Sequence, residues 1–251
     1  MIQLAGLTKR YGDFTAVDAM DLTVGHGELF GMLGPNGAGK TTTLRMIAGI
    51  LQPTAGTIRI AGISLASDPA AAKSKLGFIP DRPFIYEKLT GTEFLRFVAG
   101  LYGQGGKGVD DRGNELLALF DLEDWKDELV ESYSHGMRQK LIIASAFVHR
   151  PELIVVDEPM VGLDPKAAKL LKDLFRAYVE RGNTIIMSTH TLEVAETLCD
   201  RVAIVQHGRI SALGTMGELR SSSGGDASLE QIFLRLTGEG AARTSLQVLG
   251  A

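Results

Sequence analysis

The segment Gly34-Pro35-Asn36-Gly37-Ala38-Gly39-Lys40-Thr41 has the residue types and spacing of a loop that wraps around phosphate groups. Backbone N–H groups must point inward around phosphate oxygens, and glycines permit the dihedral angles that this curvature requires. The helical run from Thr42 to Ile50 would begin at the loop and direct the positive end of its dipole there. Lys40 would place its ammonium near the outer phosphates, and the hydroxyl of Thr41 would face Mg²⁺. We therefore predict a phosphate site at residues 34–42.

Two adjacent carboxylates follow a second apolar run. Leu153–Val156 is typical of a buried strand, and Asp157 and Glu158 come directly after it. Ligands of open α/β sheets gather at the carboxyl ends of strands, so Asp157 is placed to hold Mg²⁺. Glu158 could polarise an attacking water, a role that contributes typically ~10²–10⁴-fold to a rate. Alone, the pair could be a turn, but beside the phosphate loop the functional interpretation is favoured.

Two further sites carry polar residues in suitable places. His190 follows the buried run Thr184–Met187, where an imidazole could reach a terminal phosphate. Ser134 and Gly136 open a helix that continues to about His149, and exposed N–H groups at a helix start can bind an anion. Taken alone, Ser134 is better explained as a plain N-cap.

The elements that position these residues alternate along the chain. Short apolar runs without alternation indicate strands buried on both faces, and they occur at Leu29–Leu33, Leu76–Ile79, Leu153–Val156, Thr184–Met187 and Val202–Val205. Segments with helical spacing lie between them, which predicts an α/β fold with a mostly parallel sheet. Residues 87–129 show helical stretches without a strong strand and are interpreted as a helical insertion.

Three segments are expected to lie outside the strands and helices of the α/β fold. Gly103–Gly108 has no strand before it and is interpreted as a flexible surface loop rather than a phosphate site. Ser221–Asp226 resembles a linker, and a short amphipathic segment follows it with Leu229, Ile232, Phe233 and Leu236 on one face. We expect the last dozen residues to be loose.

The composition excludes several classes of protein. The chain has 251 residues, of which 45% are hydrophobic and 22% charged, so global disorder and fibrous structure are excluded. A formal charge of −4 argues against a general polyanion-binding surface. Cys199 is the one cysteine, so no internal disulfide can form. The sequence shows no signal peptide and no apolar stretch that could cross a bilayer, so a membrane role is expected to require a partner.

Together these motifs resemble the ATP-binding cassette ATPases over about residues 2–220. They stand in the order of that family: phosphate loop Gly34–Thr41, signature Ser134–Gln139, magnesium strand Leu153–Glu158, crossing loop Gly162–Asp164 and switch histidine His190. The resemblance implies a phosphate-loop NTPase core, an N-terminal antiparallel β subdomain and a helical subdomain at about residues 87–150. It makes residues 221–251 a linker and C-terminal tail.

The resemblance also implies a mechanism. Two cassettes, identical or related, are expected to close head to tail around ATP and Mg²⁺. Each nucleotide would contact residues 34–42 of one chain and Ser134 and Gly136 of the other. Tyr11 matches the position whose ring stacks on adenine, Glu158 the general base, and Lys40 and His190 the groups beside the γ-phosphate. The implied function is an ATPase that drives transport by a separate membrane-spanning subunit, which places it in the cytoplasm, peripheral on the inner face of the membrane.

This sequence departs from the family pattern at several positions. Asp81 stands where a Gln is usual, and it is expected to ligate Mg²⁺ together with Thr41 and Asp157. His135, Met137 and Tyr133 replace the usual Gly, Gln and Leu of the signature. These departures, and the tail from Ser228 to Thr237, look like those of exporters whose membrane subunits are separate chains.

Two other functions fit the sequence less well. Cassette ATPases that act on nucleic acid or ribosomes usually carry two cassettes or a long coiled-coil insertion, and this chain has neither, so no nucleic-acid partner is expected. A GTPase or small-molecule kinase would leave the Ser134–Gln139 segment unexplained, and the chain has no Asn-Lys-x-Asp sequence that would read guanine.

Overall fold

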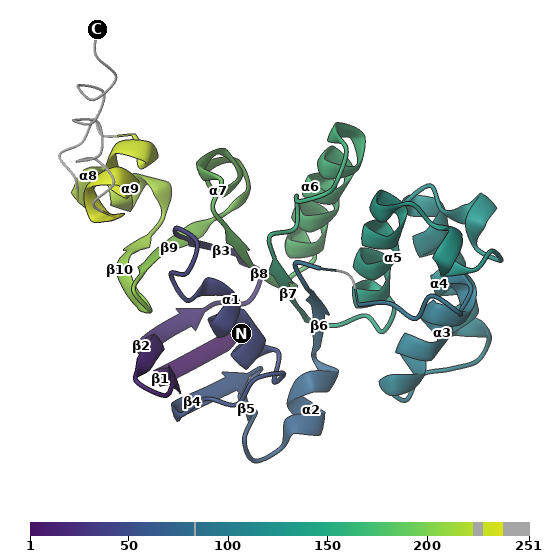
Figure 1. Cartoon of the computed structure of the whole chain (residues 1–251), viewed down its shortest axis with the longest axis horizontal. Helices are drawn as coiled ribbons and strands as arrows, with labels where there is room; N and C mark the ends of the chain where they lie inside the picture. The colour runs from purple at the N-terminus through teal and green to yellow at the C-terminus, as the bar shows by residue number, and fades with distance from the viewer. Residues whose placement is uncertain (83, 223–227, 238–251) are drawn as a thin grey trace, which may run out of the picture.

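The computed structural model describes residues 1–82, 84–222 and 228–237. Its central sheet has six strands in the order β10-β9-β3-β8-β7-β6, and all neighbours except β10 and β9 run parallel (Figure 1). The apolar runs of the sequence form β3 (Leu29–Leu33), β6 (Leu76–Ile79), β7 (Leu153–Asp157), β8 (Thr184–Thr189) and β9 (Arg201–Gln206). The remaining strand, β10 (Arg209–Gly214), pairs antiparallel at the edge. The predicted α/β fold with a mostly parallel sheet is confirmed.

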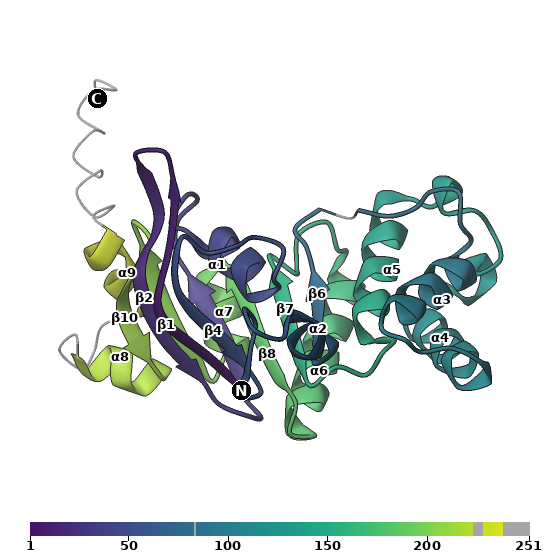
Figure 2. The same cartoon turned by 90° about the horizontal axis from the view of Figure 1, so that it is seen from below.

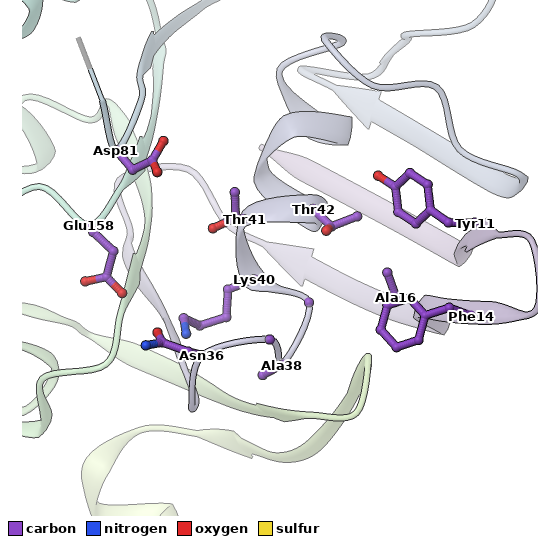
Figure 3. A pocket seen from close by; sticks show the side chains of 12 residues that line it. Tyr11, Phe14, Ala16, Asn36, Ala38, Lys40, Thr41, Thr42, Asp81 and Glu158 are labelled. Atoms are coloured by element: carbon purple, nitrogen blue, oxygen red, sulfur yellow. The ribbon is translucent and has the colours of Figure 1, made fainter.

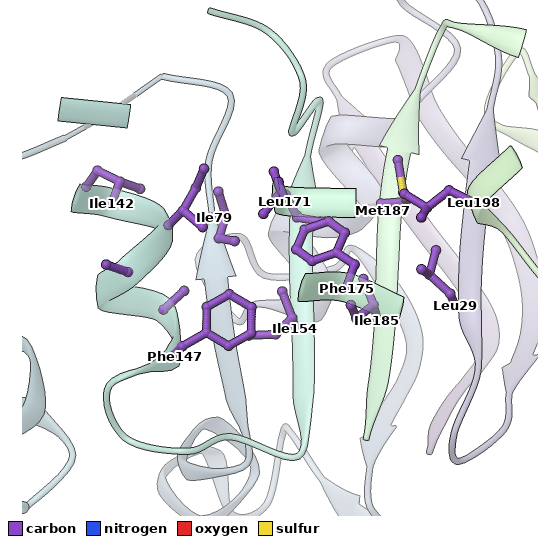
Figure 4. Packing of buried hydrophobic residues seen from close by; sticks show 14 of the residues in the cluster. Leu29, Ile79, Ile142, Phe147, Ile154, Leu171, Phe175, Ile185, Met187 and Leu198 are labelled. Carbon is purple, nitrogen blue, oxygen red and sulfur yellow. The ribbon is translucent and has the colours of Figure 1, made fainter. Parts of the chain in front are cut away.

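The central strands are mostly apolar because both faces of the sheet are covered, and the buried polar residues of β7 and β8 lie at or near the strand ends. Every residue of β3, β7 and β8 is buried. Leu29 and Ile185 face a core formed with α5 (His135–Phe147), α6 (Pro165–Glu180) and α7 (Leu192–Leu198), as Figure 4 shows. Phe30 and Ile186 face the opposite core, which includes α1 (Lys40–Ile47). Successive side chains of a strand point to opposite faces, so uniform runs are what this arrangement requires.

A second, antiparallel sheet closes the other side of α1. Its strands lie in the order β2-β1-β4-β5 and comprise β1 (Ile2–Tyr11), β2 (Phe14–Val24), β4 (Ala55–Ile60) and β5 (Ile63–Ser64). The short helix α2 (Pro69–Ser74) follows and leads into β6. The N-terminal antiparallel β part that the family resemblance implied is therefore present.

The helical insertion lies beyond the β6 edge of the central sheet, on the side away from the antiparallel sheet (Figure 2). It contains α3 (Gly91–Leu101), α4 (Lys107–Leu119), the 3₁₀ turns Glu123–Trp125 and Val130–Ser132, and α5. The predicted loop at Gly103–Gly108 is wrong for its last two residues, because α4 begins at Lys107 after Gly106, whose φ is 79°. The buried residues Val109, Leu116 and Leu117 anchor this helix.

The C-terminal part of the described chain is helical and packed. Helix α8 (Met216–Ser222) takes up the first two residues of the expected linker, so that prediction is wrong for Ser221 and Ser222. Helix α9 (Leu229–Thr237) buries Leu229, Ile232 and Phe233 in the core that also contains α7. The amphipathic face predicted there is present. The rest of the predicted linker, 223–226, and the last dozen residues lie outside the described ranges.

His149, at the end of the helical insertion, is a buried group that makes stability depend on pH. Its ring stacks on Tyr102 at 3.5 Å between centroids, and Nε2 lies 3.0 Å from the carbonyl oxygen of Leu76. A carbonyl only accepts, so Nε2 carries the proton and the buried Nδ1 has no partner within the described chain. Burial lowers the pKa of His149, and the bond to Leu76 opposes this shift only in part.

Because the folded-state pKa lies below the unfolded value of 6.5, the neutral ring stabilises the fold above that pH and the contribution is lost as pH falls below it. The loss is at most about 1.4 kcal/mol per pH unit. We expect His149→Phe, which retains a ring against Tyr102, to lose less stability between pH 7.5 and 5.5 than the unsubstituted chain. Urea unfolding at the two pH values measures this difference. Equal losses would show that His149 does not titrate on unfolding.

Candidate functional site

The loop between β3 and α1 is shaped by glycines that have no room for a side chain. A Cβ on Gly34 would lie 2.3 Å from the carbonyl oxygen of Val205, and one on Gly39 would lie 2.4 Å from that of Ala16. Gly39 also has a φ of 103° and Gly37 a φ of 80°, in the region that favours glycine. The loop therefore runs tightly against β9 and β2 and delivers the chain to the first turn of α1 at Lys40.

Lys40 is a buried cation inside this loop. Its side chain is 6% exposed, and Nζ donates hydrogen bonds to the carbonyl oxygens of Gly34 at 2.6 Å and Pro35 at 3.0 Å. Burial lowers the pKa of Lys40, while the negative charges of Glu158 and Asp157 oppose that shift. The ammonium therefore has nearby negative charge but, among the described residues, no carboxylate in direct contact, which suits it to bind an anion that enters the loop.

Asp157 lies at the end of β7. One oxygen of its carboxylate accepts hydrogen bonds, and the other has no hydrogen-bond partner among the described residues. Oδ1 accepts from the hydroxyl of Thr41 at 3.1 Å and from the hydroxyl of Ser188. Oδ2 is buried and has no partner among the described residues. Burial is the main cause that raises the pKa of Asp157, with the charges of Asp81 and Glu158 acting in the same direction. A cation beside Oδ2 would offset this cost.

The oxygen atoms at this place fit Mg²⁺. Asp157 and Thr41 offer a carboxylate and a hydroxyl oxygen within one hydrogen bond of each other, and Mg²⁺ binds such oxygens. In the part of the chain that the structure describes, no group of three or more His, Cys, Asp or Glu residues is arranged to hold a metal. A Mg²⁺ ion here would therefore need phosphate or water oxygens to complete its shell, as is usual for magnesium in nucleotide sites.

Glu158 is held in a strained and well-supported position. Its φ of 49° lies in the left-handed region, which a non-glycine residue adopts at a cost. Its N–H donates to the Ser188 hydroxyl at 3.1 Å, and its Oε1 lies 2.9 Å from Nδ1 of His190. The side chain of Glu158 is 19% exposed and that of His190 is 53% exposed. The strain thus aims a carboxylate, backed by an imidazole, at the pocket beside Lys40.

A pocket of about 340 Å³ joins these elements. In Figure 3, Asp81 and Glu158 lie on one side of the phosphate loop, and Tyr11 and Phe14 lie on the other. The lining comprises Tyr11, Phe14, Ala16, Asn36, Gly37, Ala38, Gly39, Lys40, Thr41, Thr42, Asp81 and Glu158. The predicted residues of this group come from four separate parts of the chain, and the fold brings them together around one pocket. The pocket has the size of a small-ligand site.

Three residues at the site were not predicted as site residues: Phe14 and Ala16, which line the pocket, and Ser188, which supports it. Phe14 pairs with Tyr11 across the β1–β2 hairpin and is 63% exposed, while Tyr11 is 50% exposed. The sequence feature that could have indicated Phe14 is an aromatic side chain close to Tyr11. Ser188 binds both Asp157 and the backbone of Glu158. Its signal was a hydroxyl in an otherwise apolar strand.

Ser134 and Gly136 lie outside this pocket. Ser134 caps α5, and its Oγ accepts from the N–H of Met137 at 3.3 Å. Gly136 faces the loop at Gly162, where an added Cβ would lie 3.9 Å from the Gly162 carbonyl oxygen. The second helix start suited to an anion is therefore not brought to Lys40 within one chain.

The comparisons with known proteins agree with this geometry. A family model described as ABC transporter matches residues 17–161, more than half of the chain. The chain belongs to the ABC transporter family. It is therefore a nucleotide-binding ATPase cassette, which confirms the resemblance seen in the sequence. Within the described ranges, no helix combines the length and the apolar character needed to cross a bilayer.

Relatives of this ABC cassette are found among antibiotic-resistance proteins. The daunorubicin/doxorubicin resistance ATP-binding protein DrrA of Streptomyces peucetius is 42% identical over 89% of this chain and 68% of its own length. The linearmycin resistance ATP-binding protein LnrL of Bacillus subtilis is 36% identical over 92% of this chain and 74% of its own length.

Solved structures show the same fold. The ATP-binding subunit of an ABC transporter superposes with a TM-score of 0.89 at 35% identity, over 94% of this chain and 99% of that one. A dimeric ATP-binding cassette in a post-hydrolysis state, bound to ADP and Pi, superposes with a TM-score of 0.78 at 25% identity, over 86% of this chain and 98% of that one.

Proposed function

We propose that this cassette is the ATP-hydrolysing subunit of an exporter whose membrane-spanning subunits are separate chains. The observation that carries the proposal is the pocket itself, which is lined by the phosphate loop and the strained carboxylate of Glu158. The buried carboxylate of Asp157 lies behind it, hydrogen-bonded to the lining residue Thr41. Relatives whose names assign them to drug resistance support the export direction. The transported molecule would be set by the membrane subunit.

Each site residue has a role that follows from its position. The loop N–H groups and Lys40 hold the phosphates of ATP, and Tyr11 lies where its ring can stack on adenine. Thr41 and Asp157, with Asp81 as a further oxygen donor, would hold Mg²⁺, which offsets phosphate charge when bound. Glu158 accepts the proton of the attacking water, and His190, bonded to Glu158, orients that carboxylate and faces the γ-phosphate.

We propose that a second cassette completes the site. Ser134 and Gly136 present the N-terminus of α5 outside the pocket, so a partner copy in head-to-tail arrangement can bring its own α5 to the γ-phosphate. The dimeric relative bound to ADP and Pi supports this assembly. ATP would close the dimer, and hydrolysis would open it, because the two states differ in their affinity for the nucleotide.

The helical insertion is the proposed contact with the membrane subunit. Phe84, Tyr86 and Phe97 are exposed aromatic residues in and just before it, and the rings of Tyr86 and Phe97 pack edge to face at 5.1 Å. A patch of this kind is typical of a protein interface. The cassette would then work in the cytoplasm, held on the inner face of the membrane by its partner, with no nucleic acid involved.

We propose the domain division expected from the sequence with one refinement. The cassette covers residues 2–220 and includes the helical subdomain at about 87–150, and residues 221–251 form a tail. The boundary at 220 falls inside α8, and α9 packs into the main core, so the tail would be anchored by α9 rather than separate from the cassette.

Ser134→Arg tests the two-chain site. The substitution places a long cation at the partner-facing start of α5, and we expect it to abolish the ATP-dependent dimer while leaving nucleotide binding by the single chain intact. Light scattering of the hydrolysis-deficient Glu158→Gln chain, with and without Ser134→Arg, measures the dimer in ATP. Ser221→Arg, on the exposed surface of α8, is the matched control. A dimer that survives Ser134→Arg would overturn this arrangement.

A further inference from the structure

Asp81 places a carboxylate at the nucleotide pocket, at the position where the family resemblance implied a glutamine. It follows β6, lines the pocket together with Thr41 and Glu158, and its charge acts on Asp157. Two carboxylates, Asp81 and Glu158, thus line the pocket, and a third, Asp157, is hydrogen-bonded to the lining residue Thr41. Negative charges that lie close together repel one another. An Asp81 without a neighbouring cation would therefore weaken the binding of an anionic nucleotide.

Arg45 supplies the opposite charge. Its Nη2 lies 3.5 Å from Oδ1 of Asp81, with side-chain exposures of 45% for Arg45 and 37% for Asp81. Arg45 stands four residues after Thr41 on α1, so the two side chains share one face of the helix. In the part of the chain that the structure describes, Arg45 is the cation that pairs with Asp81. Helix α1 therefore carries both Thr41, whose hydroxyl is proposed to bind Mg²⁺, and Arg45, which pairs with Asp81.

We propose that Arg45 is a positioning residue of the nucleotide site: it neutralises and orients Asp81, so that a carboxylate can stand beside the triphosphate. The inference rests on the proposed function, because it assumes that the pocket binds ATP. Arg45 acts through Asp81 and does not line the pocket itself. When Mg²⁺ is present, the metal supplies part of the same neutralisation, so Arg45 matters most in its absence.

If Arg45 only stabilised α1, a different result would be expected. Arg45 stands in the last turn of α1, where a cation interacts favourably with the helix dipole. That contribution would not depend on the residue at position 81. The carbonyl oxygen of Arg45 accepts from the N–H groups of Ile50 and Leu51, and these backbone bonds are unaffected by a side-chain substitution.

The test is a double-mutant cycle on nucleotide affinity. Calorimetry would measure the Kd of an ATP analogue with a β,γ-imido bridge for the unsubstituted chain, Arg45→Gln, Asp81→Gln and the double variant, at low salt, in Mg²⁺ and in EDTA. We expect Arg45→Gln to weaken binding by about two- to fivefold in EDTA, as fits a half-exposed ion pair. The loss should be smaller in Mg²⁺ and absent when Asp81 is Gln.

The controls separate the possible failures. Lys75→Gln removes an ion pair of similar exposure, 38% for Lys75 and 48% for Glu152, away from the pocket, and it should leave the Kd unchanged. Arg45→Lys should restore most of the affinity. If Arg45→Gln weakened nucleotide binding equally in the Asp81→Gln background, or equally in Mg²⁺ and EDTA, the proposed role of Arg45 would be overturned. The proposed function would remain intact. If the unsubstituted chain bound no nucleotide, the proposed function would fail, and this inference with it.

Discussion

Replacing Glu158 by Gln is expected to lower the rate of ATP hydrolysis by about 10²–10⁴-fold, the usual contribution of a general base. The amide cannot accept the proton of the attacking water. It keeps the size of the side chain and its oxygen can still contact His190, so the geometry of the pocket should survive. Nucleotide affinity should therefore stay within a few-fold of the original value. Phosphate release and calorimetry, measured on the same preparation, separate the two effects.

Glu152→Gln is a matched control for this experiment. Glu152 precedes β7 as Glu158 follows it, and it pairs with Lys75 at the other end of the strand. The control should hydrolyse ATP at the original rate. A Glu158→Gln chain that still hydrolysed ATP at that rate would refute the assignment of Glu158 as the base.

Replacing Lys40 by Ala is expected to remove most of the affinity for ATP. The ammonium is buried in the phosphate loop, where a charge-assisted hydrogen bond is worth about 1.5–3 kcal/mol, or roughly 10- to 150-fold in Kd. The present bonds from Nζ to Gly34 and Pro35 show that the side chain also supports the loop. Thermal unfolding should accompany the calorimetric titration, so that a loss of folding is not mistaken for a loss of binding.

Lys73→Ala controls for the removal of a lysine near the other end of α1. The side chain of Lys73 lies close to Gly49, just after the helix, and does not line the nucleotide pocket. We expect it to bind ATP as the unsubstituted chain does. If Lys40→Ala also bound ATP unchanged, the phosphate loop would not be the nucleotide site.

The parts of the fold that depend on uniform burial could be predicted from the sequence. A strand covered on both faces is apolar over most of its length, and the apolar runs of β3, β7 and β8 could be recognised for that reason. The phosphate loop could be predicted because its glycines are required by close backbone contacts at Gly34 and Gly39. Helix limits were harder to predict, since α4 begins within a glycine-rich run and α8 ends in serines.

Two supporting residues escaped prediction because they depend on contacts between distant parts of the chain. Ser188 acquires its role only when β8 lies beside β7 and its hydroxyl meets Asp157. Arg45 is an ordinary helix residue until β6 brings Asp81 to it. No local spacing announces either contact. Residues that carry chemistry within one motif can thus be predicted from a sequence, whereas those that support it across strands require the fold.

In the proposed function a nucleotide is held between two copies of the cassette, and the specific rate of phosphate release at increasing protein concentration tests this most directly. With saturating ATP and Mg²⁺, we predict that the rate per chain rises with concentration and reaches a plateau once the dimer is fully formed. A rate per chain that is constant across the whole range, or no release of phosphate at any concentration, would contradict a nucleotide site shared by two cassettes.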